Sequence, residues 1–204
     1  MLQAVSHDLR SPLTAIRAAR EGLESSELSL SPEDRAALLE TIRIEGRRLE
    51  RLVANLLDLS SLNAGAAVPR PELWSVDALV AGALEAVGAD GADVVVTLPE
   101  DVPLVRADGL QIERVLANLL ENALKHARGR VEVRVEARDG DALVWTLDDG
   151  PGPQGDPFRS GRGLGLQIAR GFAEANGGRV WVEPRPGGGA AFVVALPALQ
   201  AVRA

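Results

Sequence analysis

Among the residues of this 204-residue sequence that could take part in a chemical reaction is an isolated histidine near its start. His7 lies in SHDLRSPLT, beside Asp8 and two residues from the apolar positions Val5 and Leu9, so a helix would turn its ring toward water. A neutral imidazole has a ring nitrogen with a free lone pair that can attack phosphorus, and Asp8 could orient or deprotonate the ring. An exposed histidine on a helix is more often only a solvated residue, so the rest of the sequence must decide between the two interpretations.

A pair of asparagines, Asn118 and Asn122, lies in the segment ANLLENALKH. Their spacing of four places both on one face of a helix. Amide oxygens are hard ligands that suit Mg²⁺ when water and phosphate oxygens complete its shell. Lys125 follows one turn later and could meet phosphate charge. The alternative is a polar helix face with two incidental asparagines.

Two glycine-rich segments follow. In DDGPG, Asp148 comes at the end of an alternating apolar run, where a carboxylate can accept a hydrogen bond from an exocyclic amine such as that of adenine. In SGRGLGLQIA, Gly161, Gly163 and Gly165 precede a helical pattern, and glycine amides at a helix N-terminus can bind phosphate. Each segment alone could be an ordinary turn.

The segment that must position His7 is helical. Apolar residues recur every three or four positions up to about Asn63, and SSELSLSPED interrupts them with Ser31 as a helix cap and Pro32 at the first helical position. We therefore predict an antiparallel helical hairpin over residues 1–62. The second helix has more leucines than one hairpin can cover, which predicts a homodimer with a four-helix bundle. Alternatively, these leucines pack on the second domain.

Residues 63–72, NAGAAVPRPE, are typical of a linker, and residues 73–204 mix helical and strand patterns. Asp108 is expected to cap the helix that carries the asparagine pair. We predict helices near 76–87, 109–127 and 164–176, and strands near 94–98, 103–107, 131–138, 142–148, 179–184 and 190–197. This pattern predicts an α+β sandwich with one mixed sheet covered by helices.

Composition excludes several classes. The 22 basic and 29 acidic residues give a net charge of −7, which argues against a nucleic-acid binder. The absence of cysteine excludes disulfides and thiolate chemistry. No apolar run reaches the roughly 18 residues of a membrane span, and the first residues lack the pattern of a signal peptide. We expect a soluble, cytoplasmic core.

In their order, these four motifs resemble those of the transmitter core of bacterial sensor histidine kinases. SHDLRSPLT resembles the H-box, ANLLENALKH the N-box, DDGPG the first glycine box and GRGLGLQIA the second. The resemblance extends from His7 to about Pro197. PELWSVDALV, LPEDVPLVRAD and the segment GGRVWVEPRPGGGAAFVVALP are most similar to the KdpD-type, potassium-responsive kinases.

The resemblance implies a role for each matching residue. His7 would be the phosphoacceptor, Asp8 its acidic partner, Asn122 the Mg²⁺ ligand and Asp148 the residue that recognises the adenine amine. The implied nucleotide-binding residues are Asn118, Asn122, Lys125, His126, Asp148, Gly150, Gly152, Phe158, Gly161, Arg162, Gly163, Leu164 and Gly165.

The resemblance also implies a dimeric hairpin followed by an ATP-binding domain of the histidine kinase and Hsp90-like ATPase type. Such a core autophosphorylates on His7 with Mg-ATP and passes the phosphoryl group to an aspartate of a response-regulator receiver domain. The parent protein could be attached to the inner membrane. The alternatives are a non-catalytic dimeric scaffold with a degenerate nucleotide pocket, and a plain ATPase. The ATPase is disfavoured because an amide stands at Asn118, where ATPase relatives have a glutamate that activates water.

Three features depart from the family pattern. PQGDPFRSGR, between Gly152 and Gly163, is much shorter than the usual ATP lid, which predicts weak or fast-exchanging nucleotide. Ser11 replaces the usual Thr or Asn four residues after the histidine, so phosphatase activity is in doubt. Only six residues precede His7, so we expect either a piece of a longer protein or a chain that depends on a partner for input.

Overall fold

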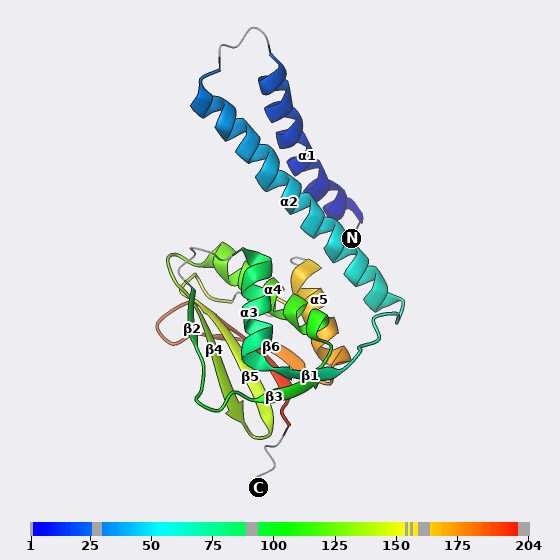
Figure 1. Ribbon diagram of the computed structural model, residues 1–204, viewed down its shortest axis with the longest axis vertical. Helices are drawn as coiled ribbons and strands as arrows, with labels where there is room; N and C mark the ends of the chain where they lie inside the picture. The colour runs from blue at the N-terminus through cyan, green and yellow to red at the C-terminus, as the bar shows by residue number, and fades with distance from the viewer. Residues whose placement is uncertain are drawn as a thin grey trace. The chain divides into compact units, whose positions relative to one another are not determined.

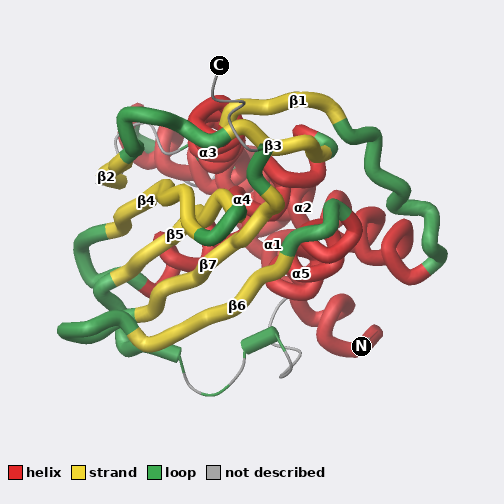
Figure 2. The backbone as a smooth tube through the Cα atoms, turned by 90° about the horizontal axis from the view of Figure 1, so that it is seen from below, coloured by secondary structure: helices red, strands yellow, loops and turns green. Residues whose placement is uncertain are grey.

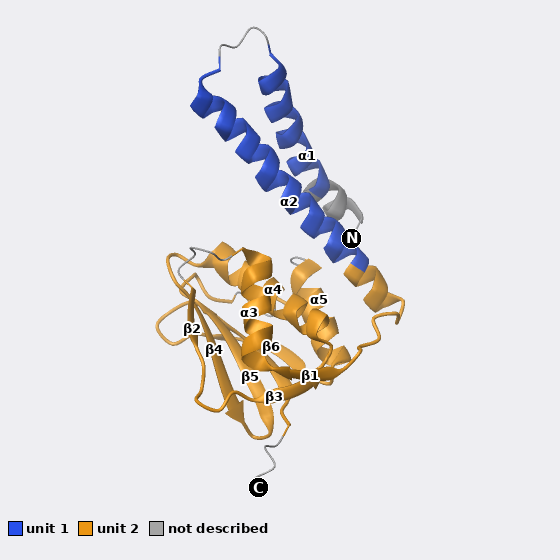
Figure 3. Ribbon diagram, viewed as in Figure 1, with its two compact units in different colours: residues 1–57 blue, residues 58–204 orange. Residues whose placement is uncertain are grey.

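The chain forms two compact units, Met1–Leu57 and Asp58–Ala204, in this computed structural model (Figure 3). The structure describes residues 2–25, 30–88, 94–153, 155, 157–158 and 164–199, without the side chains of residues 2–8. The division between the units falls inside a helix, five residues before the end of the hairpin expected from the sequence.

The first unit consists of α1 (Leu2–Glu24) and most of α2 (Pro32–Asn63), which lie side by side as a hairpin (Figure 1). Ser31 caps α2 as expected, because its hydroxyl accepts a hydrogen bond from the Asp34 amide at 3.0 Å. The two helices meet closely at Gly22, where an added Cβ would lie 3.3 Å from Leu38.

One hairpin does not cover the apolar side chains of the first unit. Large apolar residues are exposed on both helices: Leu13, Leu39, Ile44, Val53, Leu56 and Leu57. The extra leucines of α2 differ in their surroundings. Leu57 is 65% exposed, whereas Leu59 belongs to the core of the second unit. The exposed apolar residues of the first unit therefore favour the prediction that the hairpin pairs with a second copy. Leu59 instead packs in the second unit, as the alternative interpretation expected.

The second unit is a five-stranded sheet with helices on one face (Figures 1 and 2). Its strand order is β2-β4-β5-β7-β6, with β2 parallel to β4 and the other pairs antiparallel. The strands are β2 (Val94–Thr97), β4 (Val131–Arg138), β5 (Asp141–Asp148), β6 (Arg179–Pro184) and β7 (Ala190–Pro197). The helices are α3 (Val76–Val87), α4 (Gly109–His126) and α5 (Leu164–Ala175).

A second, two-stranded sheet was not expected from the sequence. β1 (Glu72–Ser75) pairs antiparallel with β3 (Leu104–Ala107), so β3 lies outside the five-stranded sheet and the expected linker ends in a strand. The prediction of a single sheet was therefore wrong. Residues 72–75 form a strand at this place because Trp74 packs against α4. A Cβ on Gly109 would come within 2.5 Å of its indole ring. Pairing with β3 satisfies the backbone groups of the segment that carries this indole.

Asp139-Gly140, a dipeptide typical of hairpin turns, lies between the strands predicted at 131–138 and 142–148, and Asp108 is the predicted cap of α4. Asp139 and Gly140 have positive φ values of 53° and 85° at the tight turn between β4 and β5. Asp108 caps α4 by accepting a hydrogen bond from the Gln111 amide at 3.1 Å. Its own amide donates to Asn176 at the end of α5 at 2.8 Å, so the start of α4 is tied to the end of α5.

The main hydrophobic core lies between the sheet and the three helices. Ile112, Val115 and Leu119 of α4 are fully buried in it. Of the helices that the structure describes, none combines the length and apolarity needed to cross a membrane.

Candidate functional site

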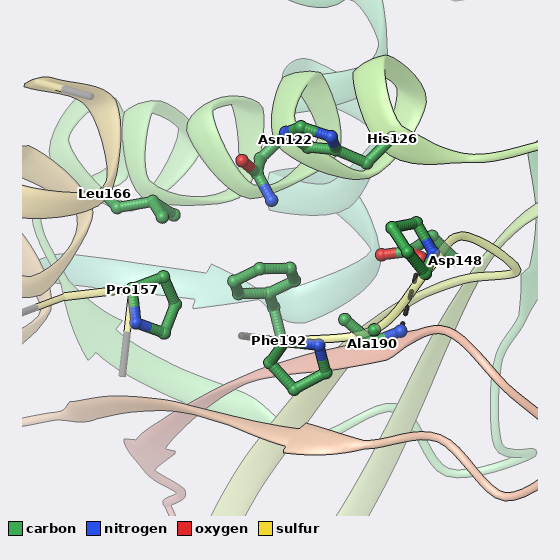
Figure 4. A pocket seen from close by; sticks show the side chains of 10 residues that line it. Asn122, His126, Asp148, Pro157, Leu166, Ala190 and Phe192 are labelled. Carbon is green, nitrogen blue, oxygen red and sulfur yellow. Dashed lines mark hydrogen bonds between the residues drawn. The ribbon is translucent and has the colours of Figure 1, made fainter. Parts of the chain in front are cut away.

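A cavity of about 270 Å³ lies beside α4, next to the segment that follows β5 and the first residues of β7 (Figure 4). Its walls come from α4, from the segment that begins at the end of β5, from α5 and from β7. The lining residues are Asn122, His126, Asp148, Pro151, Gly152, Pro153, Pro157, Leu166, Ala190 and Phe192. Three of the four predicted motifs contribute to this list.

Asp148 is the buried carboxylate of the cavity. It ends β5 and is only 2% exposed. Its Oδ1 accepts a hydrogen bond from the Gly150 amide at 2.8 Å. It accepts a second from the Ala190 amide at 3.2 Å (Figure 4). The two amide donors hold Oδ1 in place, and the carboxylate lines the cavity, where it can accept a hydrogen bond from a ligand. A buried acceptor of this kind is suited to an amine on a flat, apolar ligand.

Asp149 has a different environment from its neighbour. Its carboxylate accepts hydrogen bonds from three successive backbone amides, those of Arg128 at 2.7 Å and of Gly129 and Arg130 at 3.2 Å each. The Arg128 amide, with those of Gly129 and Arg130, holds the pKa of Asp149 below its ordinary value. Asp149 therefore orders the loop between α4 and β4, while Asp148 faces the cavity.

α4 supplies the polar wall opposite Phe192. Asn122 points its amide into the cavity, and His126 lies one turn further along the same helix (Figure 4). The amide oxygen of Asn122 is a hard donor of the type that Mg²⁺ accepts alongside phosphate oxygens. This one oxygen would fit a magnesium ion that takes its other ligands from phosphate and water.

Asn118 lies one turn before Asn122 but does not line the cavity. It is 6% exposed, and its Nδ2 donates to the Arg114 carbonyl at 2.9 Å. Its Oδ1 faces the start of α5, where a Cβ on Gly165 would lie 2.6 Å away. Glycine at position 165 therefore lets α5 begin in contact with the asparagine of α4.

The first glycine segment brings the backbone close to the cavity. An added Cβ on Gly150 would lie 2.4 Å from the His126 carbonyl oxygen, so no side chain fits there. Gly152 lines the cavity and has a φ of 80°, which favours glycine. Both glycines are thus required by local geometry.

Phe158 is not among the residues that line the cavity but packs against Phe192, which is. It is 5% exposed and packs edge-on against Phe192, with ring centroids 6.2 Å apart and an interplanar angle of 75°. Phe192 in turn lines the cavity. Phe158 is therefore held against β7 by this aromatic pair.

The remaining predicted site residues either lie away from the cavity or are not among the residues that the structure describes. Lys125 is exposed and Leu164 half-buried, and neither is among the lining residues. Gly161, Arg162 and Gly163 lie outside the described residues, as do the side chains of His7 and Asp8.

Sequence reasoning missed an apolar part of the wall. Leu166 comes from α5, while Ala190 and Phe192 come from β7. The residues GGGAA before Phe192 are a signal, since a run of small residues permits close approach to another segment. Which segment approaches depends on strand order, and the sequence did not reveal that order.

Two family models match the chain. Residues 1–65 match the His Kinase A (phospho-acceptor) domain, and residues 107–200 match the histidine kinase-, DNA gyrase B- and HSP90-like ATPase domain. A phosphoacceptor helical domain followed by this ATPase domain defines the class, and the chain belongs to the sensor histidine kinases.

Within this class, the chain is similar to the sensor protein KdpD. It is 39% identical over 228 residues to KdpD of Mycobacterium tuberculosis H37Rv, covering 97% of this chain and 26% of that protein. It is 36% identical over 217 residues to KdpD of Escherichia coli K12, covering 97% of this chain and 24% of that protein. The chain thus spans about a quarter of the length of these relatives.

Solved structures show the same fold. The histidine kinase AdeS of Acinetobacter baumannii superposes with a TM-score of 0.72 at 24% identity, over 94% of this chain and 97% of that one. Full-length ShkA in complex with AMPPNP gives 0.63 at 26% identity, over 98% of this chain and 46% of that one.

Proposed function

We propose that this chain is an ATP-dependent protein-histidine kinase core. It binds Mg-ATP in the cavity beside α4, transfers the γ-phosphoryl group to His7, and passes it to an aspartate of a response regulator. The observation that carries the proposal is the buried Asp148 carboxylate, held by two amides at one end of a cavity that also receives the Asn122 amide. The solved relative ShkA, crystallised with the ATP analogue AMPPNP, supports a nucleotide as the ligand.

Different cavity residues bind different parts of the nucleotide. Asp148 accepts a hydrogen bond from the 6-amino group of adenine, and the apolar wall with Leu166 and Phe192 contacts the base. Asn122 holds Mg²⁺, with Asn118, Lys125 and His126 nearby on α4. The magnesium ion, when bound, neutralises phosphate charge as the phosphoryl group moves.

The transfer step itself is a displacement at phosphorus. A neutral ring nitrogen of His7 forms the new N–P bond while the bond from phosphorus to the ADP oxygen breaks, and ADP leaves with the electron pair. Asp8 orients the ring. Asn118 cannot act as a general base because an amide does not take up a proton at neutral pH, so hydrolysis by water is disfavoured.

We also propose partners and a location for this core. The exposed apolar side chains of the first unit are covered in a homodimer, which presents its helical surface to a receiver domain. The full-length parent is attached to the inner membrane and holds this core on the cytoplasmic side. Because the segment between Gly152 and Gly163 is short, we expect it to make few contacts with nucleotide and the nucleotide to exchange rapidly.

Calorimetric titration with Mg-ADP tests the nucleotide site. We expect saturable binding by the wild type and at least tenfold weaker binding by Asp148→Asn, because a hydrogen bond to a charged group contributes about 1.5–3 kcal/mol. Asp141→Asn is the matched control, since Asp141 begins the same strand and pairs with Arg179 at 2.8 Å. Its affinity should equal that of the wild type.

The same titration separates the kinase from its main rival. A folded wild type that binds no ADP or AMPPNP would support a non-catalytic signalling scaffold. Tight binding with slow release would contradict the expected rapid exchange.

A further inference from the structure

The turn between β6 and β7 lies directly against the main chain of Asp148. It contains Arg185 and three glycines with positive φ, and the Arg185 amide closes it by donating to the Gly189 carbonyl at 3.1 Å. Gly189 has a φ of 101°, and an added Cβ would lie 2.0 Å from the Asp148 carbonyl oxygen. Only glycine fits this approach, so the turn forms the support behind Asp148.

The side chain of Arg185 joins three parts of the sheet at this place. Its Nη2 pairs with Glu132 Oε2 on β4 at 3.0 Å, and its Nη1 donates to the Asp148 carbonyl oxygen at 3.4 Å. The Arg185 and Glu132 side chains are only 22% and 14% exposed, so solvent screens the pair weakly. A guanidinium offers donors in a fixed fork, which suits a bridge between two acceptors.

The same turn leads into a hydrogen-bond donor of the Asp148 carboxylate. Ala190 follows Gly189, and its amide donates to Asp148 Oδ1 at 3.2 Å. The position of this amide depends on the turn, which Arg185 ties to the Asp148 main chain. Arg185 therefore acts on both the backbone and, through Ala190, the carboxylate of Asp148.

We propose that Arg185 is a positioning residue for adenine recognition: it fixes the β6–β7 turn against Asp148 so that the carboxylate meets the 6-amino group of the base. This inference rests on the proposed function, since it takes adenine as the ligand of Asp148. Arg185 acts on the nucleotide only through Asp148, so its effect appears as selectivity for the amine.

Arg134 provides a matched control. It pairs with the same carboxylate, at 3.1 Å from Glu132 Oε1, and with Glu136 at 3.7 Å, both on its own strand β4. Arg134→Gln and Arg185→Gln each remove one arginine from Glu132. Arg185→Gln alone removes the contact with Asp148.

The experiment compares ADP with purine riboside diphosphate, which lacks the 6-amino group, by titration of the 204-residue chain in the presence of Mg²⁺. The wild type should prefer ADP by roughly 10- to 100-fold, the factor expected for a hydrogen bond to a charged group. Arg185→Gln should reduce this preference to a few-fold by weakening ADP binding alone. Arg134→Gln should keep the preference of the wild type.

Other outcomes overturn the inference in distinguishable ways. If Arg185→Gln keeps the full preference for ADP, or weakens both nucleotides equally, Arg185 does not position the adenine contact. If the wild type binds both nucleotides equally, Asp148 does not recognise the amine and the inference fails with it. If the folded wild type binds neither, the proposed function itself is wrong.

Discussion

Adjacent carboxylates at the end of β5 perform separate tasks because their hydrogen-bond partners differ. Asp148 is buried and uses one oxygen for two amides, in a position where it faces the cavity. Asp149 uses both oxygens for the amides of residues 128–130. Asp148 is therefore the candidate ligand-binding group, and Asp149 holds the loop at the end of α4.

The lowered pKa of Asp149 predicts a pH-dependent contribution to stability. A carboxyl group whose pKa is lower in the folded chain than its ordinary value of 3.8 stabilises the fold above that pH. The contribution is lost as the pH falls through the folded-state pKa. Asp149→Asn should therefore lower the free energy of unfolding at pH 7, with a difference from the wild type that shrinks below about pH 3.8.

Urea unfolding of both proteins between pH 3 and 7 measures this difference. A deficit in Asp149→Asn that stayed constant over the whole range would mean that the charge of Asp149 contributes nothing.

At the scale of elements, the last turn and a half of α2 belongs to the nucleotide-binding unit. Asp58 pairs with Arg114 of α4 at 2.9 Å, and Leu59 is 8% exposed in the main core. Leu62 packs on α5, where a Cβ on Gly171 would lie 2.8 Å from its side chain. The end of α2 thus contacts α4 and α5, the two helices beside the cavity.

Truncation of Leu59 should destabilise the second unit. Leu59→Ala should cost about 2–4 kcal/mol, as for other buried leucines. Leu110→Ala is the control: Leu110 is 80% exposed on α4, so its loss should cost less than about 0.5 kcal/mol.

Tryptophan fluorescence during urea unfolding reports on this unit selectively, because all three tryptophans of the chain, Trp74, Trp145 and Trp181, lie in it. Equal midpoints for Leu59→Ala and the wild type would show that the end of α2 contributes little to the unit.

Local sequence signals predicted most elements and the polar half of the site. The Asp108 cap, the Asp139-Gly140 turn and the spacing of Asn118 and Asn122 all depend on neighbours a few residues apart. The β1–β3 pair and the wall formed by Leu166 and Phe192 depend on contacts between distant segments. Such contacts are chosen by packing in the folded chain, and periodicity within one segment does not encode them.

In the whole molecule, a helical phosphoacceptor domain precedes an ATPase domain. The two family models match these parts separately, at residues 1–65 and 107–200. The proposed phosphoryl transfer needs the ATPase domain to present its nucleotide to His7, and the rate of that transfer would depend on this positioning. The proposed function therefore requires that ATP bound to the second unit phosphorylates one residue of the first.

Incubation with γ-labelled ATP and Mg²⁺ tests this claim most directly, with the wild type compared with His7→Gln and His126→Gln. These are the two histidines of the sequence. We expect acid-labile, alkali-stable label on the wild type, no label on His7→Gln, and slower but detectable labelling of His126→Gln because His126 lines the cavity. Label that persists in His7→Gln, or a folded wild type that binds ATP and never becomes labelled, would contradict the account.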